Sequence, residues 1–364
     1  MLARILSRDY PRSRPLTLVL VLILFGLAFA PFVFTGSQPL NVAAKICVFV
    51  LLVAAYDLLL GYTGIVSFAH TMFFGIGGYG AAIALARLGP TWEALGLGIV
   101  AALVVAGLLA LVIGLFSLRV RAIFFAMITL AVASAFAVLA SQLSGFTGGE
   151  DGLNYQIPEV LRPAFRLLEN PVLGTNVNGR IITYYLVFFV ALAAFLVMLR
   201  IVNSPFGRVL QAIRENDFRA EALGYPVVVY RSIASVVSAV MAAVAGIVLA
   251  LWLRYTGPDT TLSFSIMIDV LLMVVIGGMG TLYGAVIGAT LMIIAENYLQ
   301  VLMGRLGEVS KGVPLLSALF SADRWLLWLG ILFILSVYFF PEGVVGKLRA
   351  LALGRRTETS AGER

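Results

Sequence analysis

Apolar runs of roughly 20 residues recur along most of the chain, and a helix of that length crosses the ~30 Å hydrocarbon core of a bilayer. Hydrophobic residues make up 61% of the 364 residues and charged residues 12%, against about 25% charged in a typical soluble domain. We therefore predict an all-α polytopic membrane protein with about ten transmembrane helices. The predicted spans are 15–35, 40–60, 64–86, 94–117, 122–142, 181–199, 232–253, 264–282, 283–303 and 324–340.

The distribution of Lys and Arg predicts the side on which each loop lies. If the N-terminus is cytoplasmic, the cytoplasmic tails and loops contain about twice as many Lys and Arg residues as the outer loops, in line with the positive-inside rule. Residues 1–14 and 346–364 are then cytoplasmic tails on either side of a transmembrane domain at 15–345. The second tail is polar and expected to be disordered. The one long outer loop, 143–180, carries turn residues and is expected to hold a short amphipathic helix around 158–168.

The arginine-rich start followed by an apolar run is similar to a signal peptide. The run is too long for a typical signal, and Pro31 follows the small residues that would mark a cleavage site. We therefore expect an uncleaved first span.

A charged segment at 200–231 interrupts the apolar pattern on the cytoplasmic side. Pro205 suits the first turn of a helix, because the missing N–H of proline costs nothing there. Gly224, followed by Pro226, suits a helix end. We predict one short helix over 204–224.

This predicted helix is amphipathic. Its apolar residues recur at helical spacing and form one stripe: Phe206, Val209, Leu210, Ile213 and Phe218. Its polar face mixes arginine with acidic side chains, whereas a face that lies on a bilayer would be mostly basic. We therefore predict docking in a groove of a partner protein through Arg208, Arg214, Glu215, Asn216, Glu221 and Gly224.

Glycines cluster in the third predicted span and where the eighth and ninth meet. If the ten spans are two pseudo-repeated halves of five, spans three and eight occupy matching positions in halves of opposite orientation. Glycine-interrupted segments at matching positions point to a translocation site, while small residues four apart equally suit close helix packing. Both interpretations stay open for Gly61, Gly64, Ser67, His70, Gly75, Gly78, Gly277, Gly278, Gly280 and Gly284.

Ionisable side chains in or near spans are costly and mark functional positions: Lys45, Asp57, His70, Asp269 and Glu296. Lys45 lies near the outer end of its span and can snorkel. Asp57, near the inner end, and Asp269, near the outer boundary, are expected to reach water. Glu296 is the deepest, and a pairing with Lys45 is one hypothesis.

Ser67 and His70 are three residues apart, the spacing of a nucleophile and base on one helical face. No G-x-S-x-G motif surrounds Ser67, and the sequence places no acid beside the pair. We expect no catalytic residue, and we interpret His70 as a structural hydrogen-bonding or pathway-lining group. A single histidine and a single cysteine, Cys47, also argue against a multi-histidine or thiolate metal site.

The sequence contains no nucleotide-binding motif. Residues 343–347 superficially resemble a P-loop but lack its four-residue spacer and its final Ser or Thr. No cofactor is therefore expected in this chain, and any ATPase must be a separate protein. The net charge of +7 follows the membrane topology, so nucleic-acid binding is not predicted.

Four ordered motifs resemble permease subunits of branched-chain amino-acid ABC importers, and most closely the longer LivM type. The first runs from Gly61 to His70 and continues as Phe-Phe-Gly-Ile-Gly-Gly-Tyr. The others are Thr147-Gly-Gly-Glu-Asp-Gly-Leu, the segment from Ser204-Pro-Phe-Gly-Arg to Gly224, and Gly277-Gly-Met-Gly-Thr-Leu-Tyr-Gly. The resemblance covers roughly residues 40–345.

The resemblance implies a heteromeric importer of branched-chain or other hydrophobic amino acids in the bacterial cytoplasmic (inner) membrane. Its other parts would be a second permease subunit, two cytoplasmic ATPase subunits that bind ATP, and an extracytoplasmic solute-binding protein, with lipid around the spans. Residues 208–224 would match the coupling segment that sits in an ATPase cleft. Ion pairs from Arg214 and Glu215 to the ATPase are expected there.

Two positions depart from the family pattern. Gly224 follows Glu221-Ala222 after only Leu223, where the general pattern has Glu-Ala-Ala, three residues and then Gly. Asp57 stands where amino-acid permeases have Asn, and an acidic residue at this position resembles the pattern of the related urea importers. The alternatives are a urea or short-amide importer permease, an ion-coupled secondary transporter that uses Asp57, Asp269 or Glu296, and an intramembrane hydrolase.

Overall fold

The computed structural model describes residues 13–33, 36–117, 122–166, 178–309, 320–321, 324–340 and 342–349. Within these residues, ten helical segments are long and apolar enough to cross a membrane. This confirms the predicted all-α polytopic fold. The long helices are α2 (Arg14–Val33), α3 (Ser37–Thr63), α4 (His70–Leu88), α5 (Trp92–Ser117), α6 (Ala122–Gln142), α8 (Gly179–Val202), α11 (Val227–Leu253), α13 (Phe264–Gly277), α14 (Leu282–Val309) and α16 (Trp325–Phe339).

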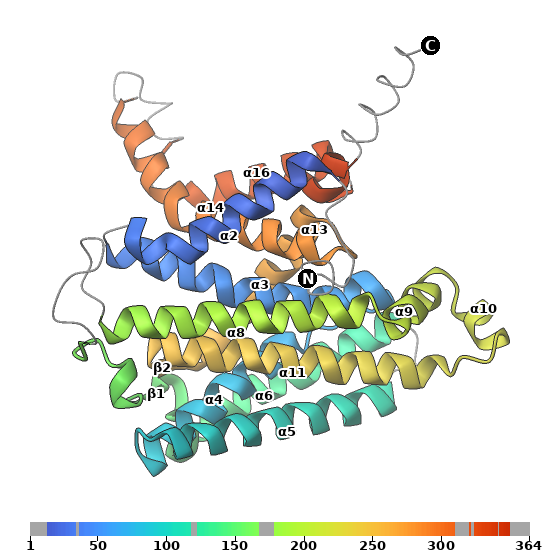
Figure 1. Cartoon of the computed structure of the whole chain (residues 1–364). Helices are drawn as coiled ribbons and strands as arrows, with labels where there is room; N and C mark the ends of the chain where they lie inside the picture. The colour runs from blue at the N-terminus through green and yellow to red at the C-terminus, as the bar shows by residue number, and fades with distance from the viewer. Residues whose placement is uncertain are drawn as a thin grey trace, which may run out of the picture.

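The core of the bundle is built around α3 and α11, which are 27 residues long each and largely buried. Figure 1 shows α3, α8, α11, α4 and α5 running side by side. Glycine allows α4 and α11 to touch, because an added Cβ at Gly77 would overlap the carbonyl of Ala243, and one at Gly246 would overlap that of Phe74. Small residues bring helices together in this way inside membranes, where apolar surface alone does not drive association.

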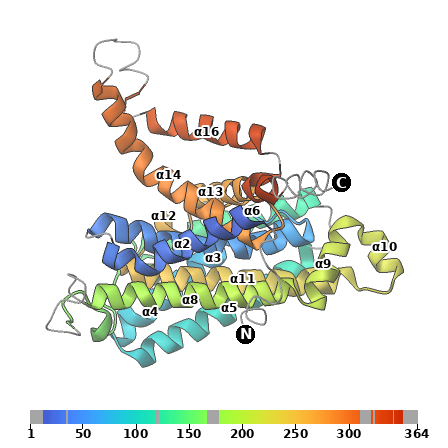
Figure 2. The ribbon, with the colours of Figure 1, turned by 45° about the horizontal axis from the view of Figure 1, so that its top comes forward.

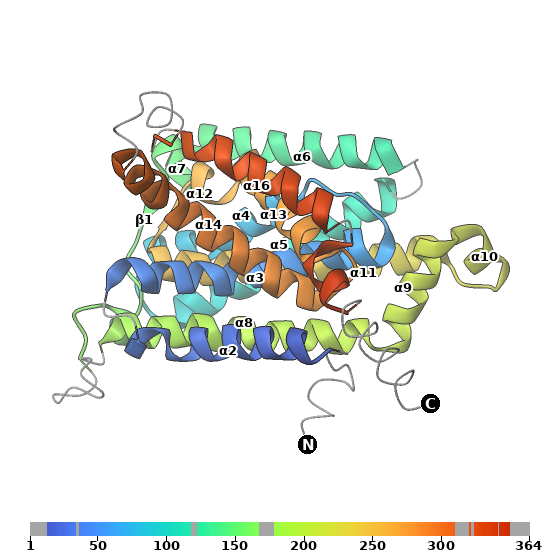
Figure 3. The ribbon, with the colours of Figure 1, turned by 90° about the horizontal axis from the view of Figure 1, so that it is seen from above.

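The remaining helices lie around this core. Figure 2 shows α16 and the far part of α14 standing away from the layered helices, while α14 also packs against α3 and α13. Figure 3 shows α2 beside α8 along one edge and α6 along the opposite edge. Two hydroxyls fix α8 to α2, since Tyr184 Oη donates to Leu27 O at 2.5 Å and Tyr185 Oη donates to Ala28 O at 2.9 Å.

Short elements cap the two ends of the bundle. At one end, called the hairpin end here, β1 (Leu153–Asn154) pairs antiparallel with β2 (Tyr255–Thr256). The other short elements at this end are α7 (Ser144–Thr147), η1 (Gly149–Asp151), η2 (Glu159–Leu161) and α12 (Pro258–Thr261). The prediction of an amphipathic helix around 158–168 is wrong for residues 158–166, where only the three-residue turn η2 forms. Residues 167–168 lie outside the described part of the chain.

The opposite end carries α9 (Pro205–Glu215) and α10 (Asp217–Ala222), which project beyond the long helices (Figure 1). Leu16 of α2, Ile287 of α14 and Val345 form a small buried cluster. Residues 343–349 are helical, so the first part of the tail predicted to be disordered is ordered. The packing of Val345 against α2 and α14 explains this order, and residues 350–364 lie outside the described part.

Candidate coupling and pathway site

The helix α9 begins where the sequence predicts. Ser204 is its N-cap, with Oγ accepting from Gly207 N at 3.4 Å, and Pro205 occupies the first helical position. Leu210 and Ile213 are buried, and Phe206 stacks on Tyr230 of α11 with ring centroids 5.6 Å apart. The first part of the predicted apolar stripe therefore holds α9 against the bundle.

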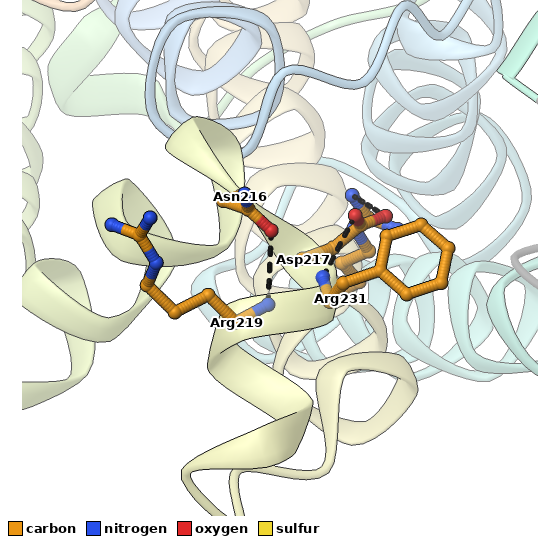
Figure 4. A network of polar contacts seen from close by, with 5 residues as sticks. Asn216, Asp217, Arg219 and Arg231 are labelled. Atoms are coloured by element: carbon orange, nitrogen blue, oxygen red, sulfur yellow. Dashed lines mark hydrogen bonds and ion pairs between the residues drawn. The ribbon is translucent and has the colours of Figure 1, made fainter.

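The prediction of one helix over 204–224 is wrong, because the helix breaks at Asn216. Asn216 adopts an extended backbone (φ −162°, ψ 102°), and its Oδ1 accepts from Arg219 N at 2.9 Å, which starts α10 (Figure 4). An Asn side chain that satisfies a free backbone N–H competes with continued helix. Asp217 forms an ion pair with Arg231 at 3.7 Å, which ties α10 to α11.

The break turns the second half of the stripe outward. Phe218, predicted to be on the apolar face, is 82% exposed, while Ala220 is buried instead. Gly224 ends α10 as predicted, with φ +91° and a hydrogen bond from its N–H to Glu221 O at 2.8 Å. Together with Tyr225 N–H bonded to Ala220 O at 3.1 Å, this is a Schellman motif.

Five members of the predicted docking set are exposed on the α9–α10 segment: Arg208, Glu215, Asn216, Glu221 and Gly224. Sequence reasoning missed three exposed apolar residues beside them. Phe218 is 82% exposed, Leu223 73% and Tyr225 41%. Large exposed apolar side chains at the polar end of a bundle mark a contact surface. The sequence signal for their exposure was their position after Asn216, a residue that can cap a new helix. We call Phe218, Leu223 and Tyr225 the apolar tip.

Arg214, the sixth member of the docking set, has a partner inside the protein. Its guanidinium Nη1 donates to the backbone carbonyl of Gly61 near the end of α3. Its stem passes over Gly64, the C-cap of α3, where an added Cβ would lie 3.3 Å from Arg214 Cγ. The side chain therefore links α9 directly to the end of the central helix.

Asp57 joins the same place to the turn between α13 and α14. It is buried, and its Oδ1 accepts from Gly280 N at 2.9 Å. The expectation that Asp57 reaches water is therefore wrong, because burial by α3 and the α13–α14 turn removes it from solvent. We call Asp57, Gly61, Arg214 and Gly280 the arginine junction.

Two glycines make the arginine junction possible. A Cβ at Gly61 would overlap Asp57 Oδ1 and Gly280 N. Gly280 has φ +80°, a left-handed conformation that favours glycine, and an added Cβ would lie 2.8 Å from Arg214 Nη1. The other predicted glycines are also close-packed: Gly75 against Leu262, Gly78 near Thr256, and Gly277 against Gly284, while Gly278 turns the chain with φ +115°. These glycines therefore lie close to neighbouring groups, while their roles in helix packing or pathway lining stay predictions.

His70 and Ser67 do not form a pair. Residues 64–69 are not helical and α4 begins at His70, so the span predicted at 64–86 starts later than expected. His70 Nε2 lies 2.7 Å from Ser238 Oγ on α11. Ser67 Oγ instead accepts from Ala69 N at 3.3 Å. The interpretation of His70 as a hydrogen-bonding group is confirmed. The Ser67–His70 hydrogen bond that an intramembrane hydrolase would need does not form between these side chains.

Lys45, Asp269 and Glu296 lie on α3, α13 and α14 and are half-buried. Glu296 interacts electrostatically with Lys45, but among the described residues the hypothesised pair forms no direct ion pair. Within the same residues, no group of His, Cys, Asp and Glu is arranged to hold a metal ion.

The ten candidate spans describe a polytopic membrane protein. The chain belongs to the family of permease components of branched-chain amino acid transport systems, whose profile matches residues 38–337.

Its relatives include the high-affinity branched-chain amino acid transport system permease protein LivM of Salmonella typhimurium, 25% identical over 349 residues, which are 91% of this chain and 75% of that protein. LivM of Escherichia coli strain K12 is 26% identical over 355 residues, with the same shares covered. A probable LivM of Methanocaldococcus jannaschii is 26% identical over 302 residues, 78% of this chain and 80% of that protein. No solved structure matches the chain.

Proposed function

We propose that this permease is one subunit of an ATP-driven importer of branched-chain or other hydrophobic amino acids in a bacterial cytoplasmic membrane. A second permease, two ATPase subunits that bind the ATP, and an outer solute-binding protein complete the transporter, and both termini lie in the cytoplasm. Family membership and the names of the LivM relatives support the substrate class. The hydrogen bond from Arg214 to Gly61 O is the observation that supports coupling between an ATPase contact at α9 and the membrane-spanning helices.

The α9–α10 segment suits an ATPase contact. Interfaces combine an apolar centre with a polar rim and are enriched in arginine. The apolar tip and the exposed Arg208, Glu215 and Glu221 all belong to the α9–α10 segment. This chain has no P-loop, so in an ATP-driven importer the energy of ATP hydrolysis has to arrive through such a contact.

The arginine junction gives that contact a route into the bundle. A displacement of α9 moves the Arg214 guanidinium, which is bonded to the end of α3 at Gly61 O. Asp57 transmits the movement to the α13–α14 turn through Gly280 N. Coupling requires contacts that differ between two states, and the bond from Arg214 is the contact we propose to differ.

Reconstituted vesicles test the function as a whole. With the complete transporter in proteoliposomes, labelled leucine should accumulate only when ATP and the liganded binding protein are both present. Uphill uptake driven by an ion gradient without ATP would contradict the proposal and favour the ion-coupled alternative. Urea uptake in place of leucine uptake would assign the chain to the urea class, although Asp57 gives that class no support because its carboxylate bonds to Gly280 N.

Arg214→Gln tests the coupling step. The variant should keep its ATPase subunits and their hydrolysis, while uptake falls by about tenfold, the effect expected from losing one charge-assisted hydrogen bond. Arg214→Lys should be intermediate, because lysine can still donate to Gly61 O but lacks the planar fork of arginine. If the ATPase subunits instead dissociate from Arg214→Gln, the residue contacts the ATPase directly, as the sequence alone suggests.

A further inference from the structure

Three ionisable side chains gather in the hairpin-end half of the membrane-spanning bundle. Lys45 lies about two turns, ~12 Å, into α3 from Ser37, and Asp269 lies in the second turn of α13 from Phe264. Glu296 lies ~21 Å along α14 from Leu282, which places it toward the same end. The helices α3, α13 and α14 pack against one another, so the three residues lie on adjoining elements at similar depth.

Their charges are close but not paired. Glu296 interacts electrostatically with both Asp269 and Lys45. Among the described residues, however, none of the three makes a hydrogen bond or an ion pair. Asp57 and His70, two other ionisable groups in the spans, are buried and each has a bonded partner. The cluster is thus unlike the structural polar groups of this bundle.

Half-buried charges without partners are costly in contact with lipid, so they face protein or a water-filled path. The structure gives them no protein partner in the described part of the chain. Two occupants remain, the second permease subunit of the proposed assembly and a permeating solute. We favour the solute, because transporters commonly bind substrate in the interior of the membrane.

The chemistry of the cluster fits one class of solute. A free amino acid carries a carboxylate and an ammonium group on the same carbon. Lys45 supplies the cation that a carboxylate requires, and Asp269 and Glu296 supply acceptors for an ammonium. A sodium ion would be repelled by Lys45, and urea, which is neutral, would leave all three charges uncompensated.

Apolar surface lies beside the charges. Phe49, one turn along α3 from Lys45, and Leu272, one turn along α13 from Asp269, are only partly buried. They offer contact to a hydrophobic side chain.

We propose that Lys45, Asp269 and Glu296 form a zwitterion site in the outer half of the translocation pathway, where Lys45 binds the α-carboxylate and the two acids bind the α-ammonium of an amino acid. This inference rests on the proposed import function and adds the residues that recognise the substrate inside the membrane.

Cysteine accessibility tests whether the cluster faces an aqueous path. In a Cys47→Ala background of the complete transporter, Lys45→Cys, Asp269→Cys and Glu296→Cys should react with an impermeant methanethiosulfonate carrying a trimethylammonium group. Saturating leucine with the binding protein should slow the reaction. Leu108→Cys on α5, 57% exposed on another face, is the lipid-facing control and should not react; Asp151→Cys, exposed at the hairpin end, should react. Three unreactive positions beside a reactive Asp151→Cys would overturn the inference.

Uptake measurements test recognition. Lys45→Gln and Glu296→Gln should each lower leucine uptake by about tenfold, the usual effect of losing a charge-assisted hydrogen bond. ATP hydrolysis stimulated by the liganded binding protein should persist, because the arginine junction is untouched. Lys45→Arg should restore most of the uptake, which a residue needed only for folding at that position would not explain.

The two proposals fail in different ways. If the Gln variants import leucine at the wild-type rate, the zwitterion site is wrong and the import function stands. If the wild-type transporter imports no amino acid, the import function is wrong and this inference falls with it. Comparable thermal unfolding of all variants in detergent excludes misfolding as the cause of a loss.

Discussion

The hydrogen bond between His70 and Ser238 determines which imidazole nitrogen carries a proton. Ser238 Oγ lies 2.5 Å from Ala55 O, and a carbonyl can only accept, so the serine hydroxyl donates there. Ser238 therefore accepts from His70 Nε2–H at 2.7 Å. This chain of two hydrogen bonds connects α4, α11 and α3 in the interior of the bundle, and Tyr56 packs edge-on against the ring with centroids 4.8 Å apart.

Removing the serine hydroxyl should therefore destabilise the fold. We expect Ser238→Ala to lower the free energy of unfolding by about 1–3 kcal/mol, because the hydrogen bonds of Ser238 Oγ with His70 Nε2 and with Ala55 O are both lost. Thermal unfolding in detergent measures this loss. The control is Ser235→Ala, a buried serine one turn away with no side-chain hydrogen bond in the described part of the structure. Equal unfolding temperatures for the two variants would contradict the role of the bond.

At the scale of helices, the places where helices end are more constrained than their middles. The end of α3, the α13–α14 turn and α9 meet at the arginine junction through Gly61 and Gly280. Each contact there involves a backbone group, so the geometry depends on how closely the chains approach. Side-chain volume at Gly61 is the most sensitive variable.

Gly61→Ala should disrupt the junction. The added methyl would overlap Asp57 Oδ1 and Gly280 N, and such overpacking typically costs about 1–3 kcal/mol. The measurement is the unfolding temperature together with the monodisperse fraction in size-exclusion chromatography. Gly96→Ala on α5 is the matched control, since nothing lies within 4 Å of its added Cβ, and it should be neutral or slightly stabilising.

The break at Asn216 makes α10 separable from α9. Asn216→Ala removes the cap and should cost about 1 kcal/mol, so amide exchange at 217–222 should quicken. Exchange in α9 should be unchanged, because Leu210 and Ile213 are buried against the bundle. Asn216→Asp, which retains an acceptor, should behave like the wild type. Equal acceleration in both helices would mean that they unfold as one unit.

On the scale of the whole molecule, the two ends are built for different contacts. The hairpin end is covered by short elements tied down by hydrogen bonds, such as Tyr155 Oη to Ala250 O at 2.8 Å. The α9 end projects an apolar tip that the described residues leave uncovered. That asymmetry places the expected partner contact at one end.

Replacing the apolar tip should separate binding from folding. In Phe218→Ser with Leu223→Ser, the unfolding temperature of the isolated subunit should stay within about 1 °C of the wild type, because both side chains are largely exposed. Co-purification of the ATPase should fall by at least about tenfold, as for an interface centre. Leu88→Ser, 61% exposed at the other end of the molecule, is the control and should retain the ATPase. Undiminished co-purification by the double variant would exclude the tip as the docking surface.

Local signals in the sequence predicted the elements but not their partners. Run length located all ten spans, and Ser204-Pro205 and Gly224 located the limits of the α9–α10 segment. The break at Asn216 was missed because an amphipathic spacing continues across it. The partners of Arg214 and His70 were missed because Gly61 and Ser238 are 153 and 168 residues away in the chain. The pseudo-repeat of two halves and the docking roles stay predictions.

The bond from Arg214 ends on a main-chain oxygen, and this has a genetic consequence. No substitution on α3 can delete that acceptor, since every residue type supplies a carbonyl. Loss-of-function alleles of this link should therefore concentrate on the donor side at position 214, or at positions that change the path of the backbone. The residues of α3 can therefore vary widely while the hydrogen bond is kept, because the bond depends on the path of the backbone and not on residue identity.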